Sequence, residues 1–239
     1  MSHEEHGHEY VPEIATSRDG KQYEVQGWQG DFYGAKLGFW LFMLTEVMMF
    51  GAMFLVLTYY FSLHHDDFIE ASSEFSVLLG GTNTVVLLIS ALTMGLGLLK
   101  MKHGDIKGAK LMIYATMILA FAFLAIKGVE WTEDYHEGIF LGLPALQAGN
   151  VDSRPLGEIL FFGMYFTMTG LHGFHIIIGI GLMLWLLKRI NAGKVSPHHY
   201  ILYFNIALYW DLVHLVWVFV FPYFYMIGAG DISGVLNGH

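Results

Sequence analysis

Hydrophobic positions gather in five long stretches that are separated by short polar segments. The stretches cover residues 36–61, 75–99, 110–131, 156–187 and 200–227. Each can cross about 30 Å of hydrocarbon at about 1.5 Å of helical rise per residue. The pattern therefore predicts an all-α, polytopic membrane helix bundle with five transmembrane helices. The fourth stretch is longer than a bilayer requires, so we expect it to tilt or to project beyond the lipid.

The polar residues predict three parts of the chain and their orientation. We expect a polar, acidic cytoplasmic segment over residues 1–35, a five-helix transmembrane domain over 36–228 and an external tail over 229–239. The orientation follows from Lys and Arg, because basic residues are retained on the cytoplasmic side during insertion. Most of them fall on one side of the predicted bundle: Arg18, Lys21, Lys36, Lys100, Lys102, Lys107, Lys110, Lys188, Arg189 and Lys194. This asymmetry predicts a cytoplasmic N-terminus and an external C-terminus.

The amino-acid composition is that of an integral membrane protein. Hydrophobic residues make up 55% and charged residues 14%, and the mean hydropathy is +0.50. The net charge of -9 comes from the segments outside the stretches, so we expect no nucleic-acid partner. The chain has no cysteine, which excludes disulfides, thiolate-ligated zinc and iron-sulfur clusters.

Ionisable side chains lie within the first and third stretches. A charged group at mid-bilayer costs about 2.5–3.5 kcal/mol on insertion scales, so each should face protein, a partner or water. Glu46 is either a proton-linked or lipid-contacting carboxylate, or a neutral acid that is hydrogen-bonded within the bundle. Lys127 and Glu130 are three residues apart, which places them on one helix face. We expect them to form a structural ion pair.

The fourth stretch carries His172 and His175 at the same spacing. Such a pair can bind haem iron, copper or a di-iron centre. Glycines nearby indicate a surface where another helix approaches closely: Gly170, Gly173, Gly179 and Gly181. We favour packing and interhelical hydrogen bonds over a metal site.

The fifth stretch carries Asp211 and His214, again on one face. They either bond each other or reach across to His172, His175 or Glu46, which would create one polar seam through the bundle. Tyrosines and tryptophans near the ends of the stretches fit an interfacial aromatic belt: Tyr59, Tyr60, Trp131, Tyr135, Tyr223 and Tyr225.

The motifs resemble those of one known family. They are residues 36–42 leading to Glu46, residues 83–88 and 126–131, the run 169–175, and the run 208–210 with Val216-Trp217 and Phe221-Pro222. The chain resembles subunit III of the haem-copper oxidases, the cytochrome c oxidase family, in its five-helix bacterial form.

The resemblance implies a non-redox accessory subunit of a respiratory haem-copper oxygen reductase in the bacterial cytoplasmic (inner) membrane. It implies packing against the catalytic subunit I, with subunit II as a further partner. Haem and copper are expected in those partner subunits, and no catalytic residue, metal or cofactor in this chain. The family also implies phospholipid bound in a cleft, and support of oxygen entry, proton uptake and active-site stability. Glu46 corresponds to the family's membrane-buried carboxylate.

The chain departs from the family pattern in three ways. Many members have seven spans. The usual Tyr-Trp-His-Phe-Val-Asp appears at residues 209–214 as Tyr-Trp-Asp-Leu-Val-His, and an acid expected shortly before it is replaced in the region of Phe204 and Asn205. An accessory subunit of a related quinol oxidase or nitric oxide reductase, and a metal-dependent membrane enzyme, remain alternatives. A small transporter is disfavoured because the stretches are unequal and lack inverted symmetry.

Overall fold

The structure, a computed structural model, describes residues 13–16, 22–25, 29–136, 155–197 and 199–228. The chain divides into two compact units after Phe42. The first unit contains strands β1 (Glu13–Thr16) and β2 (Gln22–Val25), which pair antiparallel with Glu13 opposite Val25, and the first turns of α1 (Gln29–Leu63). The hydrophobic pattern did not predict this hairpin.

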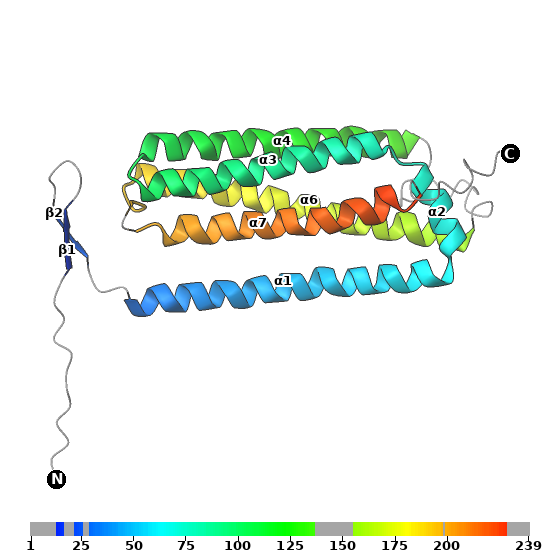
Figure 1. Cartoon of the computed structure of the whole chain (residues 1–239), viewed down its shortest axis with the longest axis horizontal. Coiled ribbons are helices and arrows are strands. Elements are labelled where there is room, and N and C mark those ends of the chain that lie inside the picture. Colours follow the sequence, from blue (N-terminus) through cyan, green and yellow to red (C-terminus); the bar gives the residue numbers. More distant parts are fainter. Residues whose placement is uncertain (1–12, 17–21, 26–28, 137–154, 198, 229–239) are drawn as a thin grey trace, which may run out of the picture. The chain divides into compact units, whose positions relative to one another are not determined.

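The second unit is a bundle of long helices (Figure 1). It contains the rest of α1, then α2 (His65–Ser73), α3 (Val77–Lys102), α4 (Ile106–His136), α6 (Leu156–Asn191) and α7 (Ile201–Phe221). Helix α3 packs on α4 and α7, and α6 packs on α4 and α7. The last turn of α7 continues as the π-helical η2 (Pro222–Met226). Proline lacks the N–H that an α-helix would use here, which fits a local change of helix type.

Among the described residues, five helices are long and apolar enough to cross a membrane, which confirms the predicted fold class. They are Lys36–Leu63, Val77–Lys102, Ile106–Asp134, Leu156–Asn191 and Ile201–Met226. These helices extend beyond five of the ten predicted boundaries, because polar end residues continue the hydrogen-bonding pattern without adding hydrophobicity. The cytoplasmic position of the N-terminus and the external position of the C-terminus stay predictions.

Local chemistry fixes the turn between α3 and α4. Gly104 adopts a φ of 83°, a conformation that side chains with a Cβ rarely take. The next residue, Asp105, accepts a hydrogen bond at Oδ1 from the Gly108 N–H over 2.8 Å, which satisfies a free donor at the start of α4. Lys100 Nζ lies 3.2 Å from Asp105 Oδ2 and joins the end of α3 to the same carboxylate.

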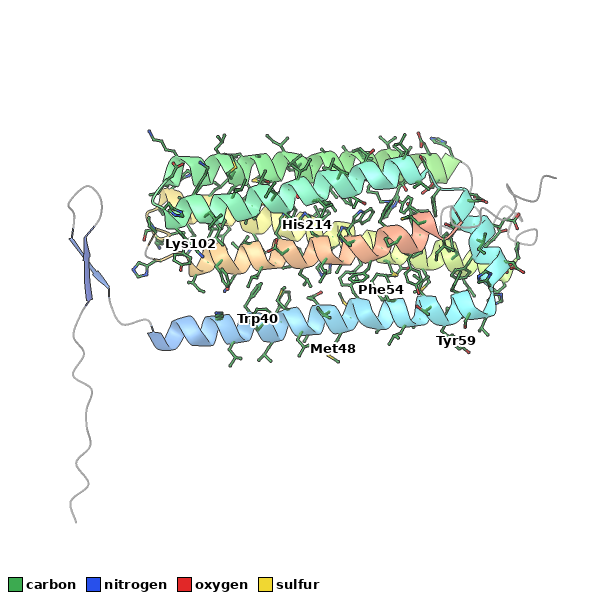
Figure 2. All side chains as sticks on the ribbon, viewed as in Figure 1. Trp40, Met48, Phe54, Tyr59, Lys102 and His214 are labelled. Atoms are coloured by element: carbon green, nitrogen blue, oxygen red, sulfur yellow. The ribbon has the colours of Figure 1, made fainter. Side chains whose placement is uncertain are left out.

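The core lies between α6 and α7, and α1 contributes least to it. Trp210, Trp217 and Tyr165 are fully enclosed, and side chains fill the space between the ribbons (Figure 2). In the 43–63 part of α1, the buried residues are Phe50 and Leu57. The most buried span is α7 and the least buried is α1.

Helix α2 corrects one expectation from the sequence. The segment between the first two stretches looked like a polar connection, yet it forms a helix whose inner face buries Phe68, Ala71 and Ser72. The Ser72 hydroxyl donates to the Phe224 carbonyl over 2.9 Å and accepts from the Gly228 N–H over 3.1 Å. Helix α2 therefore covers the end of the bundle where α7 finishes.

Candidate functional site

The first polar group of the bundle is the Lys127 network, formed by Lys127, Glu130, Tyr165 and Tyr225. Lys127 Nζ lies 3.2 Å from Glu130 Oε2, and it donates to the hydroxyls of Tyr165 and Tyr225 over 2.9 and 2.5 Å. Both hydroxyls donate onward to Glu130 Oε1, from Tyr165 over 2.8 Å. All four side chains are buried, so each charge is balanced inside the protein.

The network changes the interpretation of Tyr225. The sequence placed this residue in an interfacial aromatic belt, but its ring is fully buried and its hydroxyl bonds Lys127 and Glu130. Tyr165 was not singled out at all. Both tyrosines lie in apolar runs, so nothing in the local sequence distinguishes a buried hydroxyl from one at the lipid interface.

The second polar group joins α1 to α6. Nε2 of His175 lies 3.0 Å from Glu46 Oε2, and Nδ1 lies 2.8 Å from the Leu171 carbonyl. A carbonyl only accepts, so Nδ1 carries a proton and donates. Nε2 and the carboxyl group must then share a second proton, because two lone pairs do not attract at this distance. The pair is neutral overall, as carboxylic acid with imidazole or as carboxylate with imidazolium.

The third polar group joins α7 to α3. His214 Nδ1 donates to the Trp210 carbonyl over 2.5 Å, and Nε2 lies 2.8 Å from Ser90 Oγ. The indole N–H of Trp210 also donates to Ser90 Oγ, over 3.2 Å. His214 is buried. Of the two arrangements that the sequence left open for His214, the structure has the one that reaches across to another span.

Asp211 and His172 do not join a polar seam. Asp211 is exposed on α7, and within the described residues it forms neither a hydrogen bond nor an ion pair. His172 is fully buried between the rings of Phe123 and Trp217, with centroids 5.6 and 5.0 Å away. In the part of the chain that the structure describes, its ring nitrogens have no hydrogen-bond partner. Among the described residues, neither Asp211 nor His214 reaches His172, His175 or Glu46, so the alternative of one polar seam through these residues is wrong, although Glu46 and His175 meet each other.

The glycines of α6 differ in how closely other parts of the chain approach them. A Cβ on Gly179 would lie 2.5 Å from Trp210 Cζ3, and one on Gly170 would lie 3.3 Å from Trp131. Around Gly173 and Gly181 no described atom lies within 4 Å of such a Cβ. The prediction that another helix approaches closely is therefore wrong for Gly173 and Gly181, as far as the described residues of this chain are concerned.

The two imidazoles of α6 do not converge on a metal. His175 contacts Glu46 on α1, whereas His172 lies against α4 and α7. Across the described residues, no group of three or more His, Cys, Asp or Glu side chains is placed to hold a metal ion.

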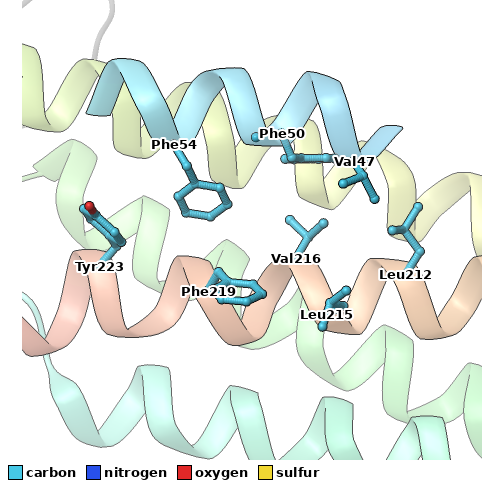
Figure 3. A pocket seen from close by; sticks show the side chains of 9 residues that line it. Val47, Phe50, Phe54, Leu212, Leu215, Val216, Phe219 and Tyr223 are labelled. Carbon is cyan, nitrogen blue, oxygen red and sulfur yellow. The ribbon is translucent and has the colours of Figure 1, made fainter. Parts of the chain in front are cut away.

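An apolar groove lies beside the Glu46–His175 pair, between α1 and α7 (Figure 3). Its volume is about 330 Å³, within the range of about 300–1,000 Å³ that is usual for ligand pockets. Its walls come from both helices: Val47, Phe50, Gly51 and Phe54 of α1, and Leu212, Leu215, Val216, Phe219 and Tyr223 of α7. Phe50 also contacts His175, with ring centroids 5.4 Å apart. At one wall, Thr58 Oγ1 and Tyr223 Oη are 2.5 Å apart.

Fold and site together define a multi-pass helical membrane protein whose buried charges are mostly neutralised inside the bundle. Residues 148–229 match the family model described as cytochrome c oxidase subunit III. Quinol oxidase subunit 3 of Bacillus spizizenii is 27% identical over 234 residues, which cover 97% of this chain and 100% of that protein.

Two further relatives are also third subunits of oxidases. Cytochrome c oxidase subunit 3 of Bacillus sp. strain PS3 is 28% identical over 194 residues, 80% of this chain and 85% of that protein. Cytochrome bo(3) ubiquinol oxidase subunit 3 of Pseudomonas aeruginosa is 28% identical over 193 residues, 80% of this chain and 84% of that protein. The chain is therefore similar to the cytochrome c oxidase subunit III family of the haem-copper oxidases, in its last third by the family model and over most of its length by these relatives.

These similarities, with the five apolar helices of the described residues, support a coarse role as an accessory oxidase subunit and a multi-pass bacterial membrane protein. In that family subunit III is non-catalytic, and haem and copper belong to other subunits of the complex. The similarity also implies assembly with catalytic subunits.

Proposed function

We propose that this chain is subunit III of a bacterial respiratory oxygen reductase of the cytochrome c oxidase type, which packs in the inner membrane against the haem-copper subunit I, with subunit II as a further partner. The observation that carries the proposal is the similarity, over most of the chain, to subunit 3 of several oxidases. Purification in a mild detergent, with the co-purifying subunits identified, tests it. Reproducible absence of a haem-copper subunit contradicts it.

A quinol-oxidising complex is the second candidate. The Bacillus spizizenii relative that aligns with 97% of this chain is a quinol oxidase subunit. The donor is expected to react with other subunits, so the purified complex must be assayed with reduced cytochrome c and with a quinol. Turnover with the quinol alone would favour this second candidate.

Within the complex, we propose that the groove between α1 and α7 holds a phospholipid acyl chain. Its apolar walls and its position between two spans support this role, because lipid chains are the apolar ligand available at that depth. The side chains proposed to contact lipid or neighbouring subunits, or to stay buried as polar groups, are Glu46, Lys127, Glu130, His172, His175, Asp211 and His214.

The groove can be filled by substitution. Gly51 lines it, and no described atom lies within 4 Å of a Cβ at this position, so Gly51→Phe should occupy the space without disturbing the helix. We expect the complex to lose bound phospholipid, as counted by native mass spectrometry, and to lose activity faster during turnover. Gly95→Phe is the matched control, because Gly95 on α3 is equally open and lies outside the groove. Equal lipid loss in both variants would contradict the proposal.

We propose that the Glu46–His175 pair supports proton uptake and active-site stability from its place beside the groove. The shared proton can move between His175 Nε2 and the Glu46 carboxyl group while the pair stays neutral, and a proton passed on from the pair must be replaced by a second one to keep it neutral. Glu46→Gln keeps the shape and removes the carboxylic acid, so we expect faster inactivation during turnover. The control is Met48→Gln, on an exposed part of the same helix. Unchanged inactivation kinetics in Glu46→Gln would contradict the role.

A further inference from the structure

Helix α7 and the first residue of η2 present an exposed stripe, formed by Asp211, Leu215, Val218 and Pro222. Leu215 also lines the groove toward α1, so the stripe borders that groove. The spacing of four, three and four residues keeps these positions on one side of an α-helix. The neighbouring positions are occupied within the chain. Trp210 and His214 contact α3, and Leu212 lines the groove toward α1.

Asp211 is the unusual member of this stripe. It lies ten residues from each end of α7 (Ile201–Phe221), or about 15 Å along the helix axis from either end. The other ionisable side chains in the middle of the described spans are enclosed or paired: Glu46, His172, His175 and His214. Asp211 alone is exposed and unpaired among these central groups of the described spans.

We propose that this stripe, here called the Asp211 stripe, docks a transmembrane helix of the haem-copper subunit that offers Asp211 a cationic or N–H/O–H donor at the same depth. The inference rests on the proposed function, and it adds the contact surface and the chemistry of the partner. Hydrocarbon contains no donor, and a phospholipid headgroup lies too far from mid-span to supply one. A helix can carry a donor there because its backbone is internally hydrogen-bonded.

A second copy of this chain fits the stripe poorly. Most homo-oligomers are symmetric, and a two-fold contact through this surface would bring two Asp211 carboxyl groups together. Like charges repel, so the surface favours a partner with the opposite chemistry.

The experiment uses the purified complex and a photo-crosslinking residue at Val218, which lies two turns from Asp211 on the stripe. The control carries it at Ile118, which is also exposed but lies on α4. We expect the Val218 derivative to crosslink a helix of the haem-copper subunit that has a donor side chain near the level of Asp211, and the Ile118 derivative not to. Crosslinks only to lipid, or to another copy of this chain, would overturn the inference.

Substitution tests the donor directly. From the usual strength of interhelical hydrogen bonds in membranes, we expect Asp211→Leu to weaken retention of the haem-copper subunit about 3- to 20-fold. Asp211→Asn keeps hydrogen-bonding atoms and should weaken it less. Ile118→Leu should leave retention unchanged. Retention of the subunit by Asp211→Leu at the wild-type level would contradict the role of Asp211.

The two levels of the proposal fail differently. If the wild-type preparation contains no haem-copper subunit, the proposed function is wrong. If the subunit is present but crosslinks from Ile118 and not from Val218, the function stands and the Asp211 stripe is wrong. The crosslink on the wild-type Asp211 background does not depend on how well the substituted chains fold.

Discussion

Lys127 is a buried cation whose neighbours combine one carboxylate with several aromatic rings. Besides Glu130 and the two tyrosine hydroxyls, its Nζ lies 5.2 Å from the ring centroid of Trp217. An ammonium group attracts the negative face of an aromatic ring, so the indole adds to the stabilisation of the charge. The arrangement replaces the hydration that Lys127 would have in water with fixed protein groups.

Removing one partner of this network should therefore strongly lower the free energy of unfolding. Lys127→Leu leaves Glu130 buried without its cation, and breaking a buried pair in this way lowers the free energy of unfolding by about 3–5 kcal/mol. The measurement is detergent-solubilised unfolding followed by circular dichroism. Lys107→Leu, at an exposed position, is the control and should stay within about 0.5 kcal/mol of wild type.

A double variant separates the pair from its surroundings. Lys127→Leu with Glu130→Leu removes both charges, so its destabilisation should be smaller than the sum of the two single changes. Additive effects would mean that the ion pair contributes nothing and that the tyrosine hydroxyls carry the stability.

At the scale of elements, the turn between α3 and α4 should respond to acid. The Gly108 N–H and the Lys100 ammonium stabilise the Asp105 carboxylate and hold its pKa below the ordinary value. A lowered folded-state pKa gives stability that is complete above the unfolded-state value of about 3.9 and is lost as the pH falls through the folded value. The protection factor of the Gly108 amide, which compares its exchange with the intrinsic rate at the same pH, should therefore fall in acid.

Two variants test whether the Asp105 carboxylate causes the acid dependence and how much the Lys100 ammonium contributes to it. Asp105→Asn keeps a cap for α4 and cannot titrate, so the protection factor of the Gly108 amide should lose its acid dependence. Lys100→Gln removes the contribution of the ammonium group and keeps that of the Gly108 N–H, so it should shift the acid transition toward higher pH without abolishing it. An unchanged pH profile in Asp105→Asn would exclude this carboxylate as the origin.

Helix α1 should depend on the Glu46–His175 contact for its position. From Met43 to Leu63 the helix buries few residues and reaches α6 and α7 through long side chains. Glu46→Leu should loosen it. Because the chain has no cysteine, spin labels at exposed Leu55 and Leu78 report the α1–α3 distance without native thiols. We expect a broader distance distribution, and no change in the control Met48→Leu.

The spans were predictable because the hydrophobicity of a membrane span adds up over about twenty residues. The pairing of Lys127 with Glu130 was predictable too, since both lie on one helix face. Partners on other helices were not. Ser90 and Tyr165 are single polar residues in apolar runs, and only the packing of α3 on α7, or of α6 on α4, decides what they bond.

The exchanged acid and base on α7 show the same limit. Asp211 and His214 share a sequence spacing that fits mutual bonding, yet one is exposed and the other is buried against α3. Three residues along an α-helix correspond to about 300° of rotation, so a helix can place one such residue in the core and the next at its surface. Spacing limits which residues can meet but does not determine which do.

At the scale of the whole molecule, the charges of the connections are divided between the two ends of the bundle, with basic residues at one end and acidic residues at the other. The α3–α4 turn and the connection from α6 to α7 lie together at one end, and α2 lies at the other (Figure 1). Lys102 and Lys107 belong to the first end, and Asp66 and Asp67 on α2 belong to the second. Basic residues stay cytoplasmic during insertion, so the α3–α4 turn should face the cytoplasm.

Single cysteines test this orientation on a clean background, since the native chain has none. In intact spheroplasts, a membrane-impermeant maleimide should label Asp66→Cys, whereas Lys107→Cys should react only after the membrane is opened. Both positions are exposed, so a difference in labelling reports the side of the membrane and not burial. The reverse pattern would invert the whole topology. It would also place the acidic α2 end in the cytoplasm, against the charge bias of the basic α3–α4 turn and α6–α7 connection.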